Sequence, residues 1–400
     1  MSKEKLIPEF RFPEFKGEWS LEELGQCLDY LQPTPFLVDN TDYNDEYEIP
    51  VLTAGKSFIL GYTNEQEGIF NENLPVIIFD DFTTASQFVD FPFKTKSSAM
   101  KILLAKNGND IKFVYESMQT LNYEVGVHKR HWISVFSKLR IAVPKPQEQQ
   151  KIASCLSSLD EVISAHSQKL DLLKDHKKGL LQNLFPQEGE TVPKVRFPEF
   201  EGDGEWELKP LEELCKLVRG PFGGALKKEI FVEEGYAVYE QSHAIYSDFR
   251  YFRYRINEEK YNELKRFSVR AGDLIMSCSG TMGKFSMIPD DSEPGVINQA
   301  LLKLSVRNGN DIFFVKTSLE TDTNQRKLLS QSAGGAIKNV VSVSQIRILE
   351  LAVPKMREQQ KIASCLSAVD ELITAQQEKI EQLKLHKKGL MQGLFPKIND

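Results

Sequence analysis

The sequence predicts an α+β protein in which two globular heads are joined by two long antiparallel helices that form a coiled coil, with a pseudo-two-fold internal repeat. Three observations support this prediction. A segment of 39 residues occurs twice in similar form, and both copies have apolar residues at coiled-coil spacing. The segments between the copies contain short apolar runs separated by turn residues. We call the repeated segments the frame and the divergent segments between them the heads. Along the chain, frame segments alternate with the two heads.

The helical part of the repeat has an offset of 210 residues. Residues 148–186 and 358–396 are identical at 26 of 39 positions, and both copies end in Leu-Phe-Pro. Between the repeated anchors the two halves of the chain diverge. One frame is therefore expected to present two different heads.

A second repeated element lies ahead of each head. Arg-Phe-Pro-Glu-Phe occurs at 11–15 and again at 196–200, and a tryptophan follows each copy. Leu-Glu-Glu-Leu then occurs at 21–24 and at 211–214, and we match these two tetrapeptides to each other.

Each helical copy has seam positions that alternate four and three residues apart, which is typical of a coiled coil. Eight of ten seam positions are apolar in each copy. A helix over 148–185 would be about 57 Å long, and it needs a partner because its apolar seam cannot stay exposed in water. The predicted coiled-coil residues are Ile152, Leu156, Leu159, Ile163, Leu170 and Leu173 in the first copy, and Ile362, Leu366, Val369, Ile373, Ile380 and Leu383 in the second.

Two seam positions are polar in each copy: His166 and Lys177 in the first, Gln376 and Lys387 in the second. These residues could fix the register of pairing at some cost in stability. Alternatively, the lysines could extend their ammonium groups into solvent at the helix ends. A further alternative for the whole frame is that each helix packs on its own head.

The segments between the helices predict two compact α+β heads, because apolar runs alternate with Gly, Asn and Asp. A helical stretch is expected near 311–330. The predicted strands cover 51–53, 57–60, 76–79 and 101–104 in the first head, and 237–239, 273–276 and 301–304 in the second. The predicted domains are 1–146 for the first head, 147–186 for the first helix, 187–356 for the second head and 357–400 for the second helix.

Composition narrows the class of protein. The 400 residues are 41% hydrophobic and 27% charged, as in ordinary globular proteins. No apolar run approaches 18 residues, so a membrane span is not expected, and the charged start lacks a secretory signal. Five cysteines without a CxxC motif favour the reducing cytoplasm.

The net charge of −7 does not by itself suggest a nucleic-acid partner. Charge is nevertheless unevenly distributed. Residues 250–270 carry seven Arg or Lys against three Glu, whereas residues 39–48 carry five acids and no base. A basic surface can therefore form locally on the second head.

Several motifs that resemble enzyme sites are incomplete. Gly55-Lys56-Ser57 resembles the end of a phosphate-binding loop, but Pro50 stands where its first glycine should be. His128 and His131 lack nearby Cys or acidic ligands for a metal. No nucleophile triad or carboxylate pair has suitable spacing. We therefore expect no catalytic residue and no metal ligand on this chain.

Polar and basic residues on turns between strands remain, and such residues can neutralise phosphates and hydrogen-bond to base edges. Phe82, Trp132 and Phe222 are expected in the core rather than as wedges between bases. Two unlike heads predict two unlike half-sites, with centres about 34–36 Å apart for major-groove readers. The predicted DNA-binding residues are Lys56, Ser57, Lys94, Lys96, Ser97, Ser98, Lys129, Arg130 and His131 in the first head, and Arg219, Lys227, Lys228, Arg250, Arg253, Ser279, Thr281, Lys284, Asn298, Gln299 and Lys338 in the second.

Over essentially its whole length the chain resembles the specificity (S) subunits of type I restriction-modification enzymes. The resemblance rests on several segments taken together. They are Ala-Val-Pro ahead of Glu-Gln-Gln-Lys-Ile in both copies (142–152 and 352–362), residues 51–62 and 78–83 of the first head, and residues 220–223, 272–275 and 279–283 of the second.

The resemblance implies that each head is a target recognition domain and that the chain is a non-catalytic, cytoplasmic subunit without its own cofactor. It implies double-stranded DNA and two modification (M) subunits as partners, with S-adenosylmethionine on M for adenine N6 methylation. One or two restriction (R) subunits would use ATP and Mg. Two alternatives remain open: a chain with its own methyltransferase or nuclease activity, and a coiled-coil scaffold whose heads bind protein.

Overall fold

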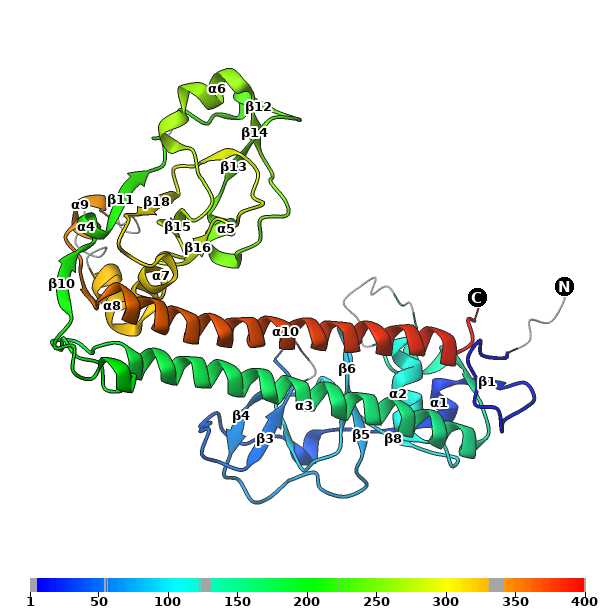
Figure 1. Cartoon of the computed structure of the whole chain (residues 1–400). Coiled ribbons are helices and arrows are strands. Elements are labelled where there is room, and N and C mark those ends of the chain that lie inside the picture. Colours follow the sequence, from blue (N-terminus) through cyan, green and yellow to red (C-terminus); the bar gives the residue numbers. More distant parts are fainter. Residues whose placement is uncertain are drawn as a thin grey trace. The chain divides into compact units, whose positions relative to one another are not determined.

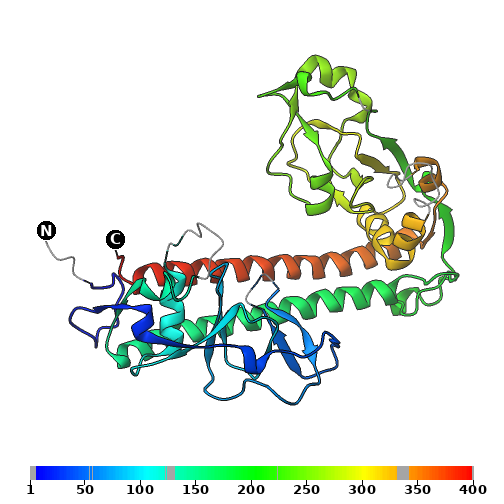
Figure 2. The ribbon, with the colours of Figure 1, turned by 180° about the vertical axis from the view of Figure 1, so that it is seen from behind.

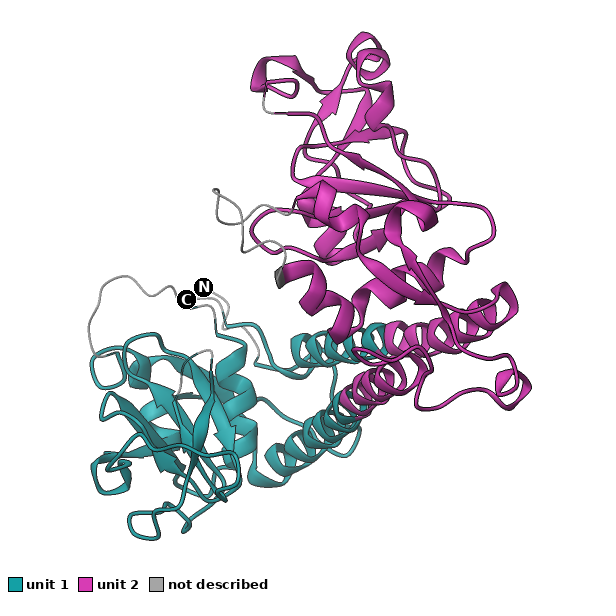
Figure 3. Cartoon of the chain, turned by 90° about the vertical axis from the view of Figure 1, so that its left-hand side faces the viewer, with its two compact units in different colours: residues 1–168, 377–400 teal, residues 169–376 magenta. Residues whose placement is uncertain are grey.

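The computed structural model describes residues 6–53, 55, 57–121, 123, 131–222, 224–330 and 342–398. The chain forms two compact units (Figure 3): unit 1 comprises residues 1–168 and 377–400, and unit 2 comprises residues 169–376. Each unit combines one head with part of both long helices. The units group residues by contact in space, whereas the predicted domain boundaries divide the chain by sequence. No helix in the described ranges is long and apolar enough to span a membrane.

Two helices of 39 residues each form the frame (Figure 1): α3 (Pro146–Leu184) and α10 (Met356–Leu394). Both begin two residues before the start of the repeated segment. A proline fits the first position of α3 because the amide of that residue would have no partner within the helix. Both helices end just ahead of a Phe-Pro pair, as proline cannot continue a helix.

Ion pairs show how the helices are aligned. In unit 1, Lys387 of α10 binds Asp160 of α3, with Nζ 2.7 Å from Oδ1. In unit 2, Lys177 of α3 binds Asp370 of α10, with Nζ 2.6 Å from Oδ1. Each unit therefore pairs an early stretch of one helix with a late stretch of the other, and the helices are antiparallel, as predicted. Because both seam lysines bind carboxylates of the partner helix, the structure favours register fixing over extension into solvent.

The head of unit 1 contains two sheets (Figures 1 and 2). The larger sheet is antiparallel with the strand order β2-β8-β5-β6, and the smaller has the order β4-β3-β7, with β3 and β7 parallel. Helix α2 (Ile111–Gln119) contacts β5 and β8 of the larger sheet. The strands are β2 (Leu28–Leu31), β3 (Ile49–Leu52), β4 (Ile59–Thr63), β5 (Val76–Asp80), β6 (Ser86–Val89), β7 (Lys94–Thr95) and β8 (Met100–Ala105).

The head of unit 2 repeats this plan. One sheet has the order β11-β18-β15-β16 and matches the larger sheet of unit 1. The other has the order β12-β14-β13-β17 and contains one strand more than the smaller sheet of unit 1. The stretch expected to be helical near 311–330 forms two helices, α7 (Ile312–Glu320) and α8 (Asp322–Ser330). The other elements are β11 (Cys215–Arg219), β12 (Phe231–Val232), β13 (Tyr236–Tyr239), α5 (Gln241–Tyr246), β14 (Arg255–Ile256), α6 (Glu258–Glu263), β15 (Leu274–Ser277), β16 (Phe285–Met287), β17 (Gly295–Ile297), β18 (Leu301–Val306) and α9 (Val343–Arg347).

A two-stranded antiparallel sheet stands where each head joins its long helix. In unit 1 it pairs β1 (Ser20–Glu23) with β9 (Arg140–Val143), and in unit 2 it pairs β10 (Glu207–Pro210) with β19 (Glu350–Val353). One-turn helices follow the first strand of each pair: α1 (Leu24–Cys27) and α4 (Leu211–Leu214).

This arrangement corrects our match between the two Leu-Glu-Glu-Leu segments. Leu21 pairs with Ala142 in the first sheet and Leu208 pairs with Ala352 in the second, so Leu208 is the counterpart of Leu21. The first tetrapeptide lies mostly in β1, whereas the second forms α4. The local sequence of the tetrapeptide does not decide its secondary structure, because backbone pairing with β9 holds the first copy in an extended conformation.

The end of each long helix contributes to the core of the unit in which it ends. In unit 1 the rings of Phe395 and Phe113 are 5.4 Å apart, and in unit 2 the rings of Phe185 and Phe314 are also 5.4 Å apart. The repeated Leu-Phe-Pro therefore places equivalent phenylalanines against equivalent head helices. Trp19 and Trp206, which follow the two Arg-Phe-Pro-Glu-Phe segments, belong to the same two apolar cores.

We call each Arg-Phe-Pro-Glu-Phe segment, residues 11–15 and 196–200, an arm. The arginine of each arm forms a bidentate ion pair with a glutamate in the first turn of a long helix. Arg11 donates to Glu148 through Nε and Nη2, both at 2.8 Å. Arg196 donates to Glu358 in the same way, both at 2.7 Å. Both glutamates are buried. The Arg-Phe-Pro-Glu-Phe motif is thus explained by the need of a buried carboxylate for a partner.

Candidate nucleic-acid interface

The turn between β15 and β16 in unit 2, residues 278–284, is held closed at its base. Ser277 donates its amide to the carbonyl of Lys284 at 2.9 Å, and its hydroxyl accepts the amide of Lys284 at 3.0 Å. Gly283 has φ +74°, and an added Cβ would lie 2.8 Å from Oε1 of Gln325 on α8. The left-handed conformation and the close approach of α8 both favour glycine at this position.

Gln241, the first residue of α5, clamps the same turn. Its amide nitrogen donates to the carbonyls of Ser279 and of Thr281, the latter at 3.3 Å. Its amide oxygen accepts the Ser279 hydroxyl at 2.9 Å. Thr281 and Lys284 are exposed on the outside of the turn. The turn therefore presents a hydroxyl and an ammonium group from a backbone that is already ordered.

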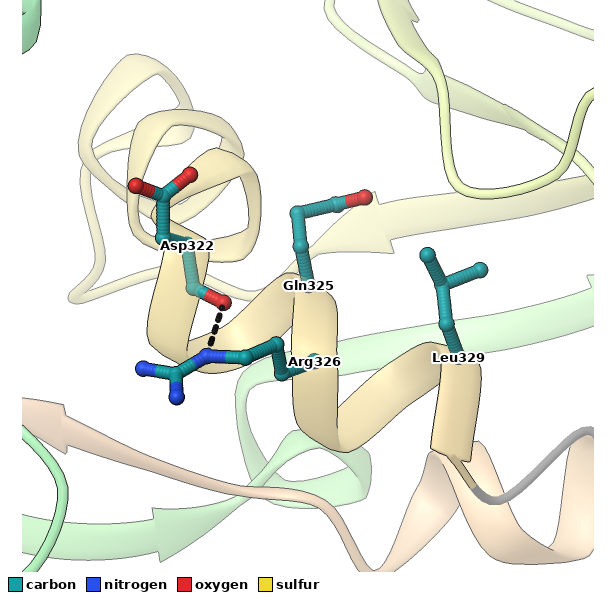
Figure 4. A pocket seen from close by; sticks show the side chains of 4 residues that line it. All are labelled: Asp322, Gln325, Arg326 and Leu329. Atoms are coloured by element: carbon teal, nitrogen blue, oxygen red, sulfur yellow. Dashed lines mark hydrogen bonds between the residues drawn. The ribbon is translucent and has the colours of Figure 1, made fainter.

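Helix α8 packs against this turn at Gly283, and one face of the helix is open (Figure 4). Asp322, Gln325, Arg326 and Leu329 line a shallow hollow on α8, and Arg326 Nε donates to the carbonyl of Asp322 at 3.3 Å. This hollow holds one carboxylate and one guanidinium and no nucleophile. No group of three or more His, Cys, Asp or Glu side chains that could bind a metal occurs in the part of the chain that the structure describes.

The ends of β11 and β17 meet beside the turn. An added Cβ at Gly220 would lie 1.8 Å from the carbonyl oxygen of Asn298, so no side chain fits there. Arg219 has one terminal nitrogen that is buried without a hydrogen-bond partner among the described residues. Burial raises the pKa of the neighbouring Cys278 thiol to about 11, although Arg219 opposes the shift. Cys278 is therefore a neutral thiol at pH 7 rather than a nucleophile.

Unit 1 has a shorter turn at the same place in its sheet, residues 81–85 between β5 and β6. One oxygen of Asp80 accepts the amides of Phe82 and Thr83, each at 2.8 Å, which leaves Thr83 exposed at the tip. The next residue, Asp81, is buried and lies 3.2 Å from the Lys101 ammonium. Thr83 was not among our predicted residues, although an Asp at a strand end followed by Thr-Thr is a recognisable turn signal.

The sheets β2-β8-β5-β6 and β11-β18-β15-β16 therefore share one strand order, and the heads differ in the hydrogen-bonded, exposed turn between equivalent strands of these sheets. Side chains on such turns can hydrogen-bond to base edges without first paying for ordering of the backbone. The difference in turn length and chemistry suits two heads that recognise different sequences.

The whole pattern matches one protein family. A family model described as "Type I restriction modification DNA specificity domain" matches residues 17–175 and 203–385, one match for each half of the chain. The chain belongs to this family.

Two curated members show the extent of the similarity. The chain is 50% identical to the "Type I restriction enzyme EcoR124I/EcoR124II specificity subunit" of Escherichia coli over 145 residues, which cover 35% of this chain and only 36% of that protein. It is 23% identical to the MjaVIII specificity subunit of Methanocaldococcus jannaschii over 411 aligned positions, covering 96% of this chain and 93% of that protein.

Solved structures of the family share the fold. The type I restriction-modification S subunit from M. genitalium has a TM-score of 0.64 at 15% identity, covering 98% of this chain and 100% of that one. A chain from a study of complex assembly and conformational transition in the type I system has a TM-score of 0.54 at 14% identity, covering 94% and 96%.

Most of the described DNA-binding candidates of this specificity-family chain reach its surface. Exposed candidates are Ser57, Ser98, Lys227, Lys228, Arg250, Arg253, Thr281, Lys284 and Gln299, and half-buried ones are Lys96, Ser97, Arg219, Ser279 and Asn298. Four others lie outside the described residues: Lys56, Lys129, Arg130 and Lys338.

Two further candidates, Lys94 and His131, are buried. Lys94 is 2% exposed, and its ammonium forms an ion pair with Glu65 at 2.5 Å and donates to the carbonyl of Glu67 at 2.7 Å. His131 is 5% exposed and lies 3.0 Å from the hydroxyl of Tyr123. The expectation of a buried Phe222 is also wrong, because this side chain is 88% exposed.

All predicted seam residues on α3 and α10 are at least half-buried. The buried members are Ile152, Leu156, Ile362, Leu366, Val369 and Ile380, and the half-buried members are Leu159, Ile163, Leu170, Leu173, Ile373 and Leu383. The burial is deepest near the start of each helix, where head residues cover the seam as well.

Proposed function

We propose that this chain is the DNA sequence-specificity subunit of a type I restriction-modification complex and that each head reads one half of a bipartite target. The observation that supports this most directly is that one sheet of each head has the same strand order but carries a differently built, hydrogen-bonded turn. Two copies of one recognition element would read the same half-site twice. Two related but different elements on a repeated frame suit a target with two unlike halves.

The chain carries no chemistry of its own in this proposal. Adenine N6 methylation would take place on two M subunits that hold S-adenosylmethionine, and ATP- and Mg-dependent DNA cleavage would require one or two R subunits. The coiled coil would set the distance between the half-sites, and the frame would dock the M subunits. A duplicated frame offers two equivalent surfaces, which suits two copies of one partner.

Methylation mapping tests the proposal. A host that expresses this chain together with its M subunit is compared with a host that expresses M alone. We expect an adenine-methylated motif in two separated parts that appears only when this chain is present. If M is soluble, the complex forms and no motif appears, the proposal fails, and a scaffold whose heads bind protein becomes the better explanation.

Exchange of one head sharpens the test. Replacing residues 28–135 by the head of another family member should change one half-site and leave the other half-site and the spacer unchanged. Inserting one heptad into both α3 and α10 should lengthen the spacer alone. A head exchange that altered both half-sites would contradict the modular assignment.

A further inference from the structure

The last residue of α5 in unit 2 and the segment after it, together residues 246–253, expose large aromatic and basic side chains. Tyr246 and Tyr251 are each 75% exposed, and the Arg250 side chain is 88% exposed. In unit 1 the most exposed aromatic side chain among the described residues is Phe10, at 48%. We call residues 246–253 the tyrosine-arginine loop.

His243 holds this loop in place from inside the head. Its Nδ1 accepts the amide of Glu240 at 2.8 Å, and its Nε2 lies 3.1 Å from the carbonyl of Tyr251, to which it donates. Its ring stacks with the rings of Phe249 and Phe252, at 6.0 and 4.8 Å between centroids. Because the phenylalanines point inward, the tyrosines and arginines of the loop are directed outward.

The loop is attached to the hairpin that carries the turn at 278–284. Helix α5 contacts β15 and β16 (Figure 1), with Gln241 at its first residue bonded to that turn. Just after α5, the Ser247 hydroxyl hydrogen-bonds the hydroxyl of Ser286 on β16. Ser286 is two residues beyond Lys284, a distance of about 7 Å along a strand. A ligand held by the turn therefore extends readily to the loop.

Arg250 is presented as a fork with its geometry already set. Its Nε and Nη2 donate to the two oxygens of Asp248 at 2.9 and 2.7 Å, and both side chains are exposed. The Arg250 hydrogen bonds hold the pKa of Asp248 far below its ordinary value, so Asp248 stays charged. Arg253 is exposed as well, with its guanidinium 4.7 Å from the ring centroid of Tyr254. A phosphate accepts the same bidentate geometry that Asp248 accepts here.

We propose that the tyrosine-arginine loop binds the sugar-phosphate backbone of double-stranded DNA beside the half-site that unit 2 reads. Arg250 exchanges Asp248 for a phosphate, Arg253 binds a second phosphate, and Tyr246 and Tyr251 pack against the sugars. This inference rests on the proposed function. Phosphate contacts add affinity without reading sequence, so the loop strengthens binding at one half-site and leaves the choice of bases to the turn.

The proposal is tested on the complex of the full chain with its M subunit. We measure how DNA affinity depends on salt concentration and compare variants that should weaken binding with one that should strengthen it. Two duplexes are used: one with the mapped target, and one with the unit 2 half-site scrambled. The double variant Arg250→Gln, Arg253→Gln should weaken binding to both duplexes by roughly tenfold and reduce the slope of log K against log salt by about 1.8, or 0.9 per lost phosphate. Tyr246→Ala with Tyr251→Ala should weaken both duplexes with an unchanged slope.

Asp248→Asn should do the reverse and tighten binding to both duplexes, because it removes the carboxylate that competes with phosphate. The methylated motif should be the same for all variants. Lys260→Gln is the matched control: Lys260 is also an ion-paired cation of this head, 2.8 Å from Glu263, and it lies outside the loop. Its affinity and slope should equal those of the wild-type complex.

Three results would overturn the inference: an unchanged salt slope in the arginine variant, a loss confined to the intact target, or a loss of M subunit from the complex on gel filtration. The second result would make the loop a base reader and the third a protein contact. Failure of the proposed function looks different, since the wild-type complex would then bind the two duplexes equally. The salt slopes still decide the role of the loop in that case.

Discussion

The two units use one frame but join it to their heads with different chemistry. In unit 1, Lys112 and Glu116 of α2 form a network with Asp160 of α3 and Lys387 of α10, and all four contacts are 2.7–2.8 Å. In unit 2, Phe313 and Thr317 stand at the equivalent positions of α7, counted from the aspartate that caps each helix. The pair between Lys177 and Asp370 is the counterpart there of the pair between Lys387 and Asp160.

This difference shows that two copies of a repeated sequence can form different ion pairs in the folded chain. The ion-pairing residues of the frame are repeated, since Asp160 and Lys177 of α3 correspond to Asp370 and Lys387 of α10. One head nevertheless adds a glutamate, Glu116, that is 1% exposed and binds a frame lysine. A buried carboxylate without a cation is costly. Helix α2 of unit 1 is thus tied to the frame by ion pairs, whereas α7 of unit 2 has uncharged residues at the two equivalent positions.

The largest effects should come from the feature that the units share. Arg11→Met and Arg196→Met each leave a buried glutamate without its cation, so each should lower the free energy of unfolding by about 3 kcal/mol. Urea denaturation of the full chain measures this. Lys151→Met is the control, because its ammonium is half-exposed and 3.8 Å from Glu14, and it should change little. Arginine penalties that differ by more than about 2 kcal/mol would show that the arms are not equivalent.

A smaller loss of stability should distinguish unit 1 from unit 2. Lys387→Met leaves Glu116 with Lys112 as its one remaining cation, and we expect a loss of about 2 kcal/mol. The repeat-equivalent change, Lys177→Met, breaks a more exposed pair and should cost under about 1 kcal/mol. Thermal unfolding of both variants beside the wild-type chain measures the contrast. Equal penalties would mean that the network in unit 1 adds nothing to the simple pair.

The smallest effect is a pH dependence in unit 1. Burial raises the pKa of Asp160, but hydrogen bonds from Lys112 and Lys387 outweigh it and leave the pKa below its ordinary value. Such a carboxyl stabilises the fold above its unfolded pKa, about 3.9, and loses this contribution as the pH falls through the folded value. Asp160→Asn should therefore cost stability at pH 7 and progressively less below about pH 3.9.

The size of this effect should stay under about 1 kcal/mol, because the Asp160 side chain is 36% exposed and solvent screens its pairs. The measurement is the difference in unfolding free energy between wild type and variant at each pH. Asp171→Asn, at an exposed pair on α3, serves as the control and should show no trend. A penalty that grew in acid would reverse the sign assigned to Asp160.

Sequence periodicity was sufficient to predict the frame. Ile152 and Ile362 follow heptad spacing, and prolines after the helices define their ends, so local patterns carried the information. The strands at 76–79 and 301–304 were predicted for the same reason, because short apolar runs between turn residues leave few alternatives. The correspondence between the two Leu-Glu-Glu-Leu segments was predicted wrongly. The first copy lies mostly in β1, which is held by pairing with residues far away in the sequence.

The sequence indicated only part of the geometry of the candidate site. Ser279, Thr281 and Lys284 were proposed because Gly and polar residues cluster there, but the hydrogen bonds from Gln241 join residues 38 apart and leave no local signal. The burial of Lys94 could not be predicted, because it depends on Glu65 and on the carbonyl of Glu67, which are distant in the sequence. The expectation of a buried Phe222 was wrong, since hydrophobicity alone does not show whether a turn faces solvent.

The sequence by itself determined that this protein has two related halves, two long helices and two unlike heads, because repetition and periodicity are properties of the chain. Only the tertiary structure decided which helix ends in which unit, which polar residues are consumed by ion pairs, and which turn each head presents. Those outcomes depend on contacts between distant residues, where burial makes an ion pair or a hydrogen bond far more consequential than it is in water.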